Sequence, residues 1–164
     1  MATTEPPGPN VTIVPLAERP QAIPTLERWF VSEWAPWYGP SGPGDAARDL
    51  AECLNRDELP LAWVAVDEEG GVIGTAALRM DSAGSETGLG PWLAALLVDQ
   101  GYRGRGVGTA LIAAVEDGAA RLGYPALYVS TDVAMGLVER RGWWAVGTTE
   151  TLRGEATIYV KTLA

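Results

Sequence analysis

The stretch that most constrains this chain is residues 96–111, where an apolar run gives way to an arginine, alternating glycines and a second apolar pattern. Residues 92–98 are apolar throughout, which predicts a strand, and from residue 107 apolar side chains recur at helical spacing. Glycines between the two let the backbone take positive φ and let a ligand approach the main chain. Unpaired N–H groups at a helix start attract anions, and Arg103 and Arg105 can add charge-assisted hydrogen bonds. The stretch therefore predicts a loop that binds a diphosphate.

The glycine spacing excludes two common phosphate-binding loops. A nicotinamide or flavin loop needs G-x-G-x-x-G, but the third glycine position is Thr109 or Leu111, depending on the first glycine chosen. A nucleoside triphosphate loop needs a lysine followed by serine or threonine, whereas Val107 and Gly108 occupy those positions. The pattern that matches is R-x-x-G-x-G, at residues 103–108.

The remaining chain alternates patterns typical of strands and helices, with no internal repeat and no linker. The predicted order is β-α-α-β-β-β-α-β-α-β-β, a mixed, mostly antiparallel sheet with helices on both faces. Residues 1–9 are expected to form a disordered tail, residues 10–164 a single domain, and residues 35–44, rich in proline and glycine, a loop. Strands are predicted at residues 11–16, 61–66, 72–80, 92–98, 126–131, 144–152 and 156–163, and helices at residues 20–34, 45–54, 107–122 and 133–141.

The composition narrows the chemistry that this chain can perform. It contains no histidine, which excludes Ser-His and Cys-His catalysis and argues against a metal site. Its single cysteine, Cys53, cannot form an internal disulfide, and no apolar run reaches 18 residues. We therefore expect a cytoplasmic protein that does not span a membrane.

Charge is divided unevenly between the two parts of the chain. Residues 1–97 hold five arginines and fourteen acidic residues, a net charge of −9, whereas the charges of residues 98–164 cancel. Such a distribution attracts cationic ligands and argues against binding nucleic acid. An ordinary solvated surface accounts for the same acidity, so a cationic ligand is one of two open interpretations.

With this element order around it, the segment R-x-x-G-x-G at residues 103–108 resembles the coenzyme A pyrophosphate loop of the GNAT (general N-acetyltransferase) superfamily. Residues 137–143, Leu-Val-Glu-Arg-Arg-Gly-Trp, resemble the family's L-Y-E-x-x-G-[FW] segment, and the similarity extends over about residues 10–163. The resemblance implies an α/β (α+β) GNAT fold with six to seven strands, splayed between the fourth and fifth. It also implies acetyl-CoA as the cofactor, with the pantetheine arm entering between these two strands.

Carried onto this chain, the resemblance assigns cofactor binding to the end of the fourth strand, the glycine loop and the end of the fifth strand. The thioester carbonyl would lie near residues 93–96, where strand N–H groups could polarise it. The implied reaction is acetyl transfer to a primary amine of a small, cationic molecule by direct attack. The implied cofactor-binding residues are Leu96, Leu97, Val98, Arg103, Gly104, Arg105, Gly106, Val107, Gly108, Thr109 and Thr131.

The catalytic positions do not follow the family pattern. Val138 stands where many members carry a tyrosine that protonates the leaving thiolate. The candidate substitutes on the neighbouring strand are Ser130, Thr131 and Tyr128. No glutamate lies in the fourth strand as a ready base, so Glu33, Glu86 and Asp45 are the candidates from the acceptor side. The candidate acceptor-binding residues, of which the aromatic ones could equally belong to the core, are Trp34, Trp37, Tyr38 and Asp45.

Two rival functions remain open at this point. Val138 and the lack of a clear base favour a coenzyme A-binding sensor domain without catalysis. A protein N-acetyltransferase is the other rival, and it would need an open groove across the last two strands. The aromatic segment at residues 34–38 favours a closed pocket for a small molecule instead. The sequence identifies neither the acceptor nor the oligomeric state, and a homodimer is compatible with it.

Overall fold

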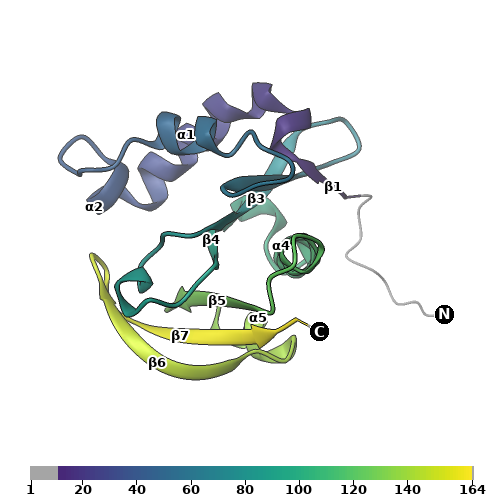
Figure 1. Ribbon diagram of the computed structural model, residues 1–164. Coiled ribbons are helices and arrows are strands. Elements are labelled where there is room, and N and C mark those ends of the chain that lie inside the picture. Colours follow the sequence, from purple (N-terminus) through teal and green to yellow (C-terminus); the bar gives the residue numbers. More distant parts are fainter. Residues whose placement is uncertain (1–10, 164) are drawn as a thin grey trace.

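The computed structural model describes residues 11–163, and the tail predicted at residues 1–9 lies outside this range. Its centre is a seven-stranded sheet in the order β1-β2-β3-β4-β5-β7-β6 (Figure 1). Neighbouring strands are antiparallel except β4 and β5, which are parallel, so the predicted mixed, mostly antiparallel sheet is confirmed. The strands are β1 (Thr12–Pro15), β2 (Leu61–Val66), β3 (Val72–Arg79), β4 (Trp92–Val98), β5 (Ala126–Thr131), β6 (Trp144–Thr151) and β7 (Gly154–Thr162).

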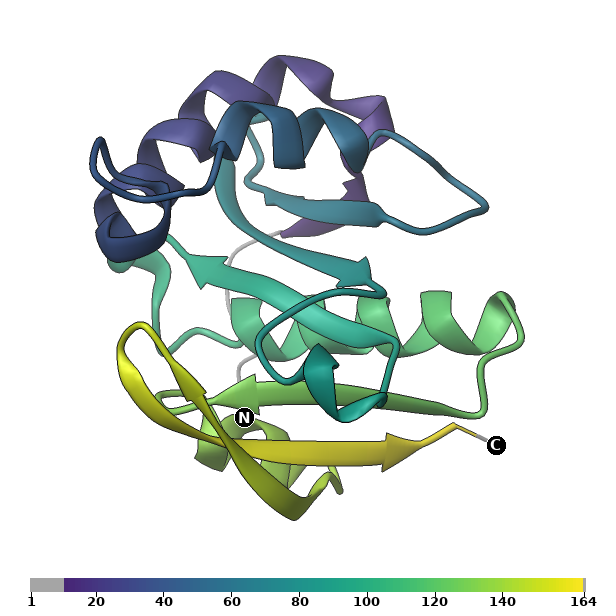
Figure 2. The ribbon, with the colours of Figure 1, turned by 60° about the vertical axis from the view of Figure 1, so that its left-hand side comes forward.

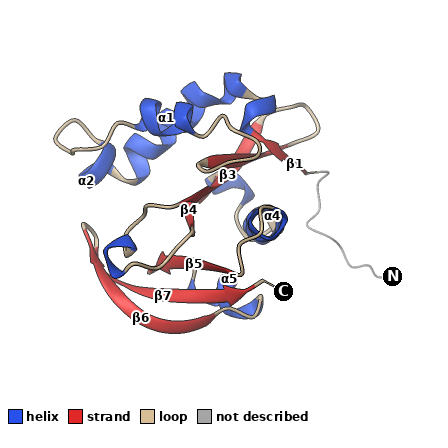
Figure 3. Cartoon of the chain, viewed as in Figure 1, coloured by secondary structure: helices blue, strands red, loops and turns tan. Residues whose placement is uncertain are grey.

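Helices cover both faces of the sheet, as Figure 3 shows. Successive side chains of a strand point to opposite faces, and β2 is buried on both. Its Ala62 and Val64 belong to one apolar cluster with α1 and α3, whereas Trp63 and Ala65 belong to a second cluster with α4. Among residues 11–163, no helix has the length and apolar character needed to cross a membrane. The helices are α1 (Ile23–Glu33), α2 (Ala35–Tyr38), α3 (Ala46–Glu52), α4 (Val107–Arg121) and α5 (Met135–Arg140).

The segment predicted as a loop at residues 35–44 begins with a short helix, α2. Pro36 is tolerated there because it lies in the first turn, where its missing N–H has no helical partner. The ring of Phe30 holds the turn in place, since Trp34 packs edge-on against it at 5.1 Å and Tyr38 packs against it at 5.5 Å between centroids. Tertiary contacts between aromatic rings therefore override the local proline and glycine signals.

A buried carboxylate ties α4 to the C-terminal part of the chain. Glu116 on α4 accepts hydrogen bonds from the Arg141 guanidinium at 2.6 and 3.1 Å and from the Trp143 indole at 2.9 Å. Lys161 on β7 lies 3.8 Å from the same carboxylate. Burial alone would raise the pKa of Glu116, but these hydrogen bonds and charges outweigh it and hold the pKa below its ordinary value. The cluster fixes the direction of α4, whose first turn carries the glycine loop.

The strands β4 and β5 separate soon after they meet. A single residue pair, Trp92 with Tyr128, joins them, and the Tyr128 N–H donates to the Pro91 carbonyl at 3.0 Å. Beyond this point no further pairing between β4 and β5 is found in residues 11–163. The predicted splay between the fourth and fifth strands is confirmed, and it leaves one edge of β4 open.

Candidate active site

The glycine loop lies exposed between β4 and the start of α4. Gly104 and Gly106 both adopt left-handed backbone conformations, with φ of 77° and 84°, which a β-branched residue strongly disfavours. Gly106 is the N-cap of α4, and no side chain caps the helix there. The first backbone hydrogen bond of the helix runs from the Ala110 N–H to the Gly106 carbonyl at 3.0 Å. The N–H groups of the first helical turn therefore point outward without partners of their own, as an anion site requires.

Two arginines flank this helix start. Arg103 donates its Nε–H to the Val98 carbonyl at 3.0 Å, which ties the loop to the end of β4 and leaves the other guanidinium donors outward. Arg105 lies over the Tyr102 ring at 5.5 Å from the centroid, a cation–π contact. The Tyr102 hydroxyl in turn donates to Asp67 in the β2–β3 turn at 3.4 Å. Both positive charges are thus exposed beside the free N–H groups of α4.

The open edge of β4 carries main-chain groups next to this loop. The Asp99 N–H donates to the Ile73 carbonyl of the neighbouring β3 side at 2.8 Å. Because the direction of main-chain groups alternates along a strand, those of Leu97 also face β3, and those of Leu96 and Val98 face the opposite edge. The two residues predicted to contact the cofactor therefore direct their main-chain groups toward the gap between β4 and β5, where the Val98 carbonyl already accepts from Arg103.

A bulge interrupts β4 just before these residues. Thr75 of β3 pairs with Leu97, but Ala77 pairs with Ala94, so β4 holds one extra residue over this interval. Ala95 lies inside the bulge with a φ of 54°, and it is the only residue other than glycine with positive φ within the described chain. The bulge turns main-chain groups of β4 away from the ladder, at the segment where the resemblance places the thioester carbonyl.

Two other predicted cofactor residues have local structural reasons for their identity. A side chain at Gly108 would meet Leu137 at 3.0 Å, so this glycine lets the first turn of α4 approach α5 closely. The Thr131 hydroxyl accepts hydrogen bonds from the main-chain N–H groups of Val133 and Ala134 at 3.2 and 2.9 Å, and so it closes the turn after β5. Their predicted contacts with a cofactor stay predictions.

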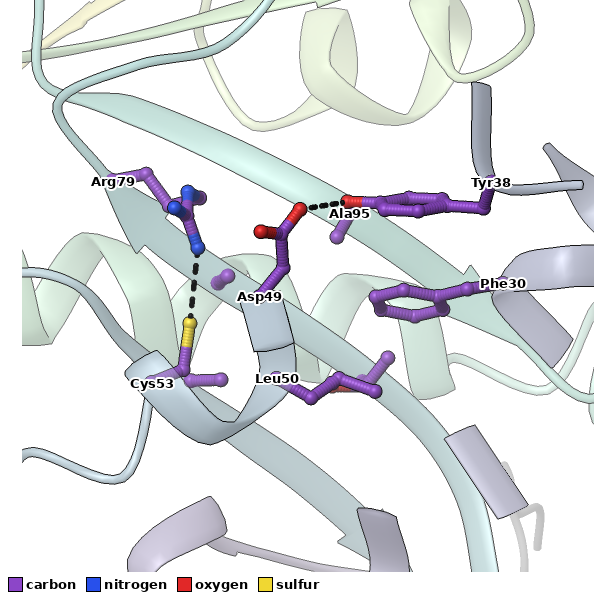
Figure 4. Close-up of a pocket in the computed structure, with 10 residues that line it drawn as sticks. Phe30, Tyr38, Asp49, Leu50, Cys53, Arg79 and Ala95 are labelled. Atoms are coloured by element: carbon purple, nitrogen blue, oxygen red, sulfur yellow. Dashed lines mark hydrogen bonds between the residues drawn. The ribbon is translucent and has the colours of Figure 1, made fainter. Parts of the chain in front are cut away.

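On the other face of the sheet, a narrow pocket lies beneath α1, α2 and α3 (Figure 4). The Tyr38 hydroxyl donates to Asp49 Oδ2 at 2.7 Å across this pocket. Burial and the hydrogen bond to Asp49 raise the pKa of Tyr38 above its ordinary value, so the hydroxyl remains a donor. The pocket is lined by Phe30, Tyr38, Asp49, Leu50, Cys53, Ala62, Thr75, Ala77, Arg79 and Ala95.

Arg79 is the cation of the pocket, and other groups already neutralise it. Its guanidinium pairs with Glu52 at 3.3 Å and with Asp81 at 3.2 Å, and it donates to Cys53 Sγ at 3.4 Å. Burial raises the pKa of the Cys53 thiol to about 11, so this side chain is neutral near pH 7. Asp49 is the only carboxylate among the lining residues, and it gives the pocket its negative charge.

The structure does not bring together the residues predicted as base, acid and acceptor site. Of these, only Tyr38 lines the pocket. Asp45 caps α3 by accepting from the Arg48 N–H at 3.0 Å, and the Trp34 ring packs on Phe30. The others lie apart. Glu33 pairs with Arg153 at 3.8 Å, and the turn between β6 and β7 reaches toward the part of the chain that contains α2 (Figure 2). Glu86 accepts from Thr149 at 2.8 Å, Ser130 donates to the Ala83 carbonyl at 2.7 Å, and Trp37 is 45% exposed.

Val138, at the position where many family members carry tyrosine, is a core residue in this chain. It is fully buried on α5, in the same apolar cluster as Trp143 and Tyr159. The Tyr159 hydroxyl is not free either, because it donates to Glu139 at 2.5 Å. The helix α5 itself, Met135–Arg140, contains no tyrosine that could donate a proton.

Sequence reasoning missed Asp49 and Arg79. Asp49 lies on α3 next to the buried Leu50, and Arg79 ends β3 in a chain region predicted only as a strand. The one available signal was that each borders an apolar stripe, which does not distinguish a pocket residue from a solvated one. Their meeting depends on how α3 lies over the sheet.

Comparisons with known proteins agree with this geometry. The sequence model of the acetyltransferase (GNAT) family matches residues 24–143, which is more than half of the chain. A search among curated protein sequences finds no match.

Solved structures share the fold at low identity. An aminoglycoside 6'-N-acetyltransferase complexed with coenzyme A superposes with a TM-score of 0.74 at 19% identity, covering 93% of this chain and 97% of that one. The aminoglycoside 6'-N-acetyltransferase from Enterococcus faecium gives 0.71 at 19% identity, with the same coverage. A GNAT-family acetyltransferase from Staphylococcus aureus Mu50 gives 0.69 at 16% identity, covering 94% and 99%. The family match and the shared fold agree, and the chain is a member of the acetyltransferase (GNAT) family.

Proposed function

We propose that this protein transfers the acetyl group of acetyl-CoA to a primary amine of a small, cationic molecule. The observation that carries the proposal is the exposed loop at the start of α4, which has two left-handed glycines, free N–H groups and two arginines. This loop adjoins the open edge of β4, so a diphosphate and an extended chain can be held side by side.

The residues present fit acetyl-CoA, the acyl donor of the family. Residues 103–109 would hold the diphosphate through main-chain N–H groups, and Leu96 and Val98 would pair with the amide groups of the pantetheine arm like an added strand. When bound, acetyl-CoA supplies an acetyl thioester that an amine can attack. The bulged segment at residues 93–96 would place main-chain N–H groups beside the acetyl carbonyl. Acetyl-CoA and the amine would approach this segment from opposite faces of the sheet, so the two reactants would come together there.

Three observations support a small, cationic amine as the acceptor. The pocket beneath α1 to α3 is narrow and contains the carboxylate of Asp49, whereas its arginine, Arg79, is paired with Glu52 and Asp81. The chain has a formal net charge of −9, all of it from residues 1–97. Two of the structural neighbours are named as enzymes that acetylate aminoglycosides, which are small molecules carrying amino groups.

Proton transfer in this protein has to proceed without a tyrosine at the usual position. Val138 has no proton to give and is buried in the core. Ser130 remains the candidate donor, although its hydroxyl is engaged with the Ala83 carbonyl and has to rotate to serve. Water is the other source available at the open edge of β4.

A screen of amines with acetyl-CoA, following the release of free thiol, tests this function. We expect turnover with at least one small amine carrying positive charge, and little with N-terminal or lysine-containing peptides. Tight binding of acetyl-CoA by calorimetry without turnover of any amine would overturn the proposal in favour of a coenzyme A-binding sensor. Preferred turnover of peptides would favour a protein acetyltransferase instead.

A further inference from the structure

We propose that Asp49 binds a second, non-reacting ammonium group of the acceptor, and that the substrate class is therefore small diamines or polyamines. The inference rests on the proposed function and adds the substrate class and the residue that selects it. In this assignment Asp49 touches the substrate, and Tyr38 is a positioning residue that holds the carboxylate.

The pocket connects Asp49 to the segment of β4 where the reaction is proposed to occur. Ala95 of the β4 bulge and Asp49 of α3 line the same pocket, with small residues of β2 and β3 between them. Figure 4 shows the Asp49 carboxylate between the Tyr38 ring and the Arg79 guanidinium, with Ala95 on the strand behind. The bulged segment of β4 and this carboxylate are therefore parts of the lining of one pocket.

Asp49 retains an unused acceptor. Its Oδ2 accepts from the Tyr38 hydroxyl, whereas Oδ1 has no hydrogen bond or ion pair to any residue between 11 and 163. An ionised carboxylate accepts at both oxygens, so one oxygen remains for a ligand. A primary ammonium group carries three N–H donors, one of which can donate to Oδ1 of Asp49.

The surroundings of Asp49 favour a cation over a neutral group. Arg79, the only cation among the lining residues, forms ion pairs with Glu52 and Asp81 and has none with Asp49, so its charge is offset mainly by those two carboxylates. The rings of Phe30 and Tyr38 form one wall, and aromatic faces attract an ammonium group. An ammonium group at Asp49 would therefore lie between this aromatic wall and an arginine that is already paired with two carboxylates.

The Asp49 carboxylate is unsuited to bind the amine nitrogen that attacks the thioester. An amine must lose a proton before it is nucleophilic, and a neighbouring carboxylate favours the charged ammonium form instead. An amine such as that of lysine has an ordinary pKa of about 10.4, so it is already charged at neutral pH. Contact with Asp49 therefore suits a nitrogen that stays protonated throughout, and a second nitrogen on the same molecule performs the attack.

The test compares 1,4-diaminobutane with butylamine, which has the same chain and lacks the second nitrogen. We expect the wild-type protein to prefer the diamine in kcat/KM by about 10- to 100-fold, the range of one hydrogen bond between charged groups. Asp49→Asn should abolish this preference by raising the KM for the diamine much more than the KM for butylamine, while the affinity for acetyl-CoA stays unchanged. Asparagine keeps an acceptor for Tyr38, so the fold of the pocket is preserved.

Two further variants make the result decisive. Asp57→Asn removes the same charge from an exposed carboxylate that pairs with Arg121 outside the pocket, and it should keep the preference for the diamine. Tyr38→Phe removes only the hydroxyl that holds Asp49, and it should reduce the preference partly, through the KM for the diamine alone. It also supplies a second readout if Asp49→Asn does not fold.

The outcomes separate this inference from the proposed function. If neither amine is acetylated, and no other amine is, the proposed function fails. If amines are acetylated but the wild-type protein does not prefer the diamine, or Asp49→Asn keeps the preference, the assignment of Asp49 is wrong while the proposed function stands.

Discussion

The donor side and the acceptor side of the proposed site are built in different ways. The donor side comprises residues 96–109, one uninterrupted segment that forms the end of β4, the glycine loop and the first turn of α4. The acceptor side is the pocket beneath α1 to α3, whose lining residues come from six separate segments between Phe30 and Ala95. A local segment can carry its own recognition pattern, whereas a pocket assembled from distant segments cannot.

The two sides also use different chemistry. The donor side offers main-chain N–H groups, which depend on backbone conformation and hardly on side-chain identity, together with exposed positive charge. The acceptor side offers side-chain groups, with the half-buried Asp49 as its source of charge. Substitutions on the donor side should therefore act through the backbone, and those on the acceptor side through charge and hydrogen bonding.

The largest effect is expected from Gly106→Val on the donor side. Valine in a left-handed conformation is strained, and relieving the strain moves the N–H groups that the diphosphate needs. We expect the dissociation constant for acetyl-CoA to rise by about two to three orders of magnitude, since several charge-assisted hydrogen bonds are lost together. Calorimetry on the folded variant measures this change.

Gly101→Ala is the matched control for that experiment. Gly101 precedes the loop, has no left-handed conformation, and a side chain there would meet no atom within 4 Å. Its affinity for acetyl-CoA should equal that of the wild-type protein. Unchanged affinity in Gly106→Val would remove the basis for calling this loop the donor side.

The next effect compares two carboxylates, Glu116 on the helix that follows the glycine loop and Asp49 on the acceptor side. Glu116→Ala leaves Arg141, Trp143 and Lys161 without their shared acceptor, and we expect it to lower the free energy of unfolding by about 3 kcal/mol. Asp49→Asn should cost less than about 1 kcal/mol, because Asp49 is half-buried and its asparagine can still accept from Tyr38. Urea denaturation of both variants measures the difference, and equal losses would contradict the distinction between a structural and a ligand-binding carboxylate.

The pH dependence of the free energy of unfolding gives a second measure of how much ionised Glu116 stabilises the fold. Its pKa in the folded protein is depressed, so its stabilising contribution is present above the ordinary glutamate pKa of about 4.3 and is lost as pH falls through the lower folded value. The difference in unfolding free energy between the wild-type protein and Glu116→Gln should therefore shrink below pH 4. A difference that grows on acidification would contradict this sign.

A smaller effect is expected at Val138, the core position next to the donor side. Val138→Ala removes buried methyl groups and should cost about 2 kcal/mol of stability, with little change in kcat for the folded protein. Val138→Tyr should destabilise by about 1–3 kcal/mol through overpacking, without a gain in rate. Thermal melts measure the loss of stability in both variants, and steady-state rates measure the change in kcat. A tyrosine variant that gains kcat without losing stability would mean that this side chain reaches the reacting sulfur.

The smallest expected effect is that of salt on the acceptor side. Screening acts over about 8–10 Å at physiological ionic strength, so attraction of a cation by acidic residues weakens as salt rises. Between low and moderate salt, we expect the KM for 1,4-diaminobutane to rise about two- to threefold and that for butylamine to rise less. An equal response of the two amines would show that charge does not distinguish them.

Much of the fold followed from pattern, and the exceptions have physical causes. The seven strands and the long helix α4 were predicted because alternating or helical runs of apolar residues are local properties. The short helix α2 was not, since the rings of Trp34 and Tyr38 stabilise it through Phe30, a contact between different turns of the chain. Local proline and glycine signals were outweighed by that packing.

The sequence by itself determined the donor side: its strand, its glycine spacing and its arginines occupy consecutive positions, and backbone geometry there depends on the residues themselves. Only the tertiary structure decided the acceptor side. Tyr38 and Asp49 are eleven residues apart and meet because α2 and α3 pack over the same face of the sheet. Ala95 lies in the bulge of β4 and lines the same pocket. Contacts between separate segments depend on how whole elements pack, which no short stretch of sequence encodes.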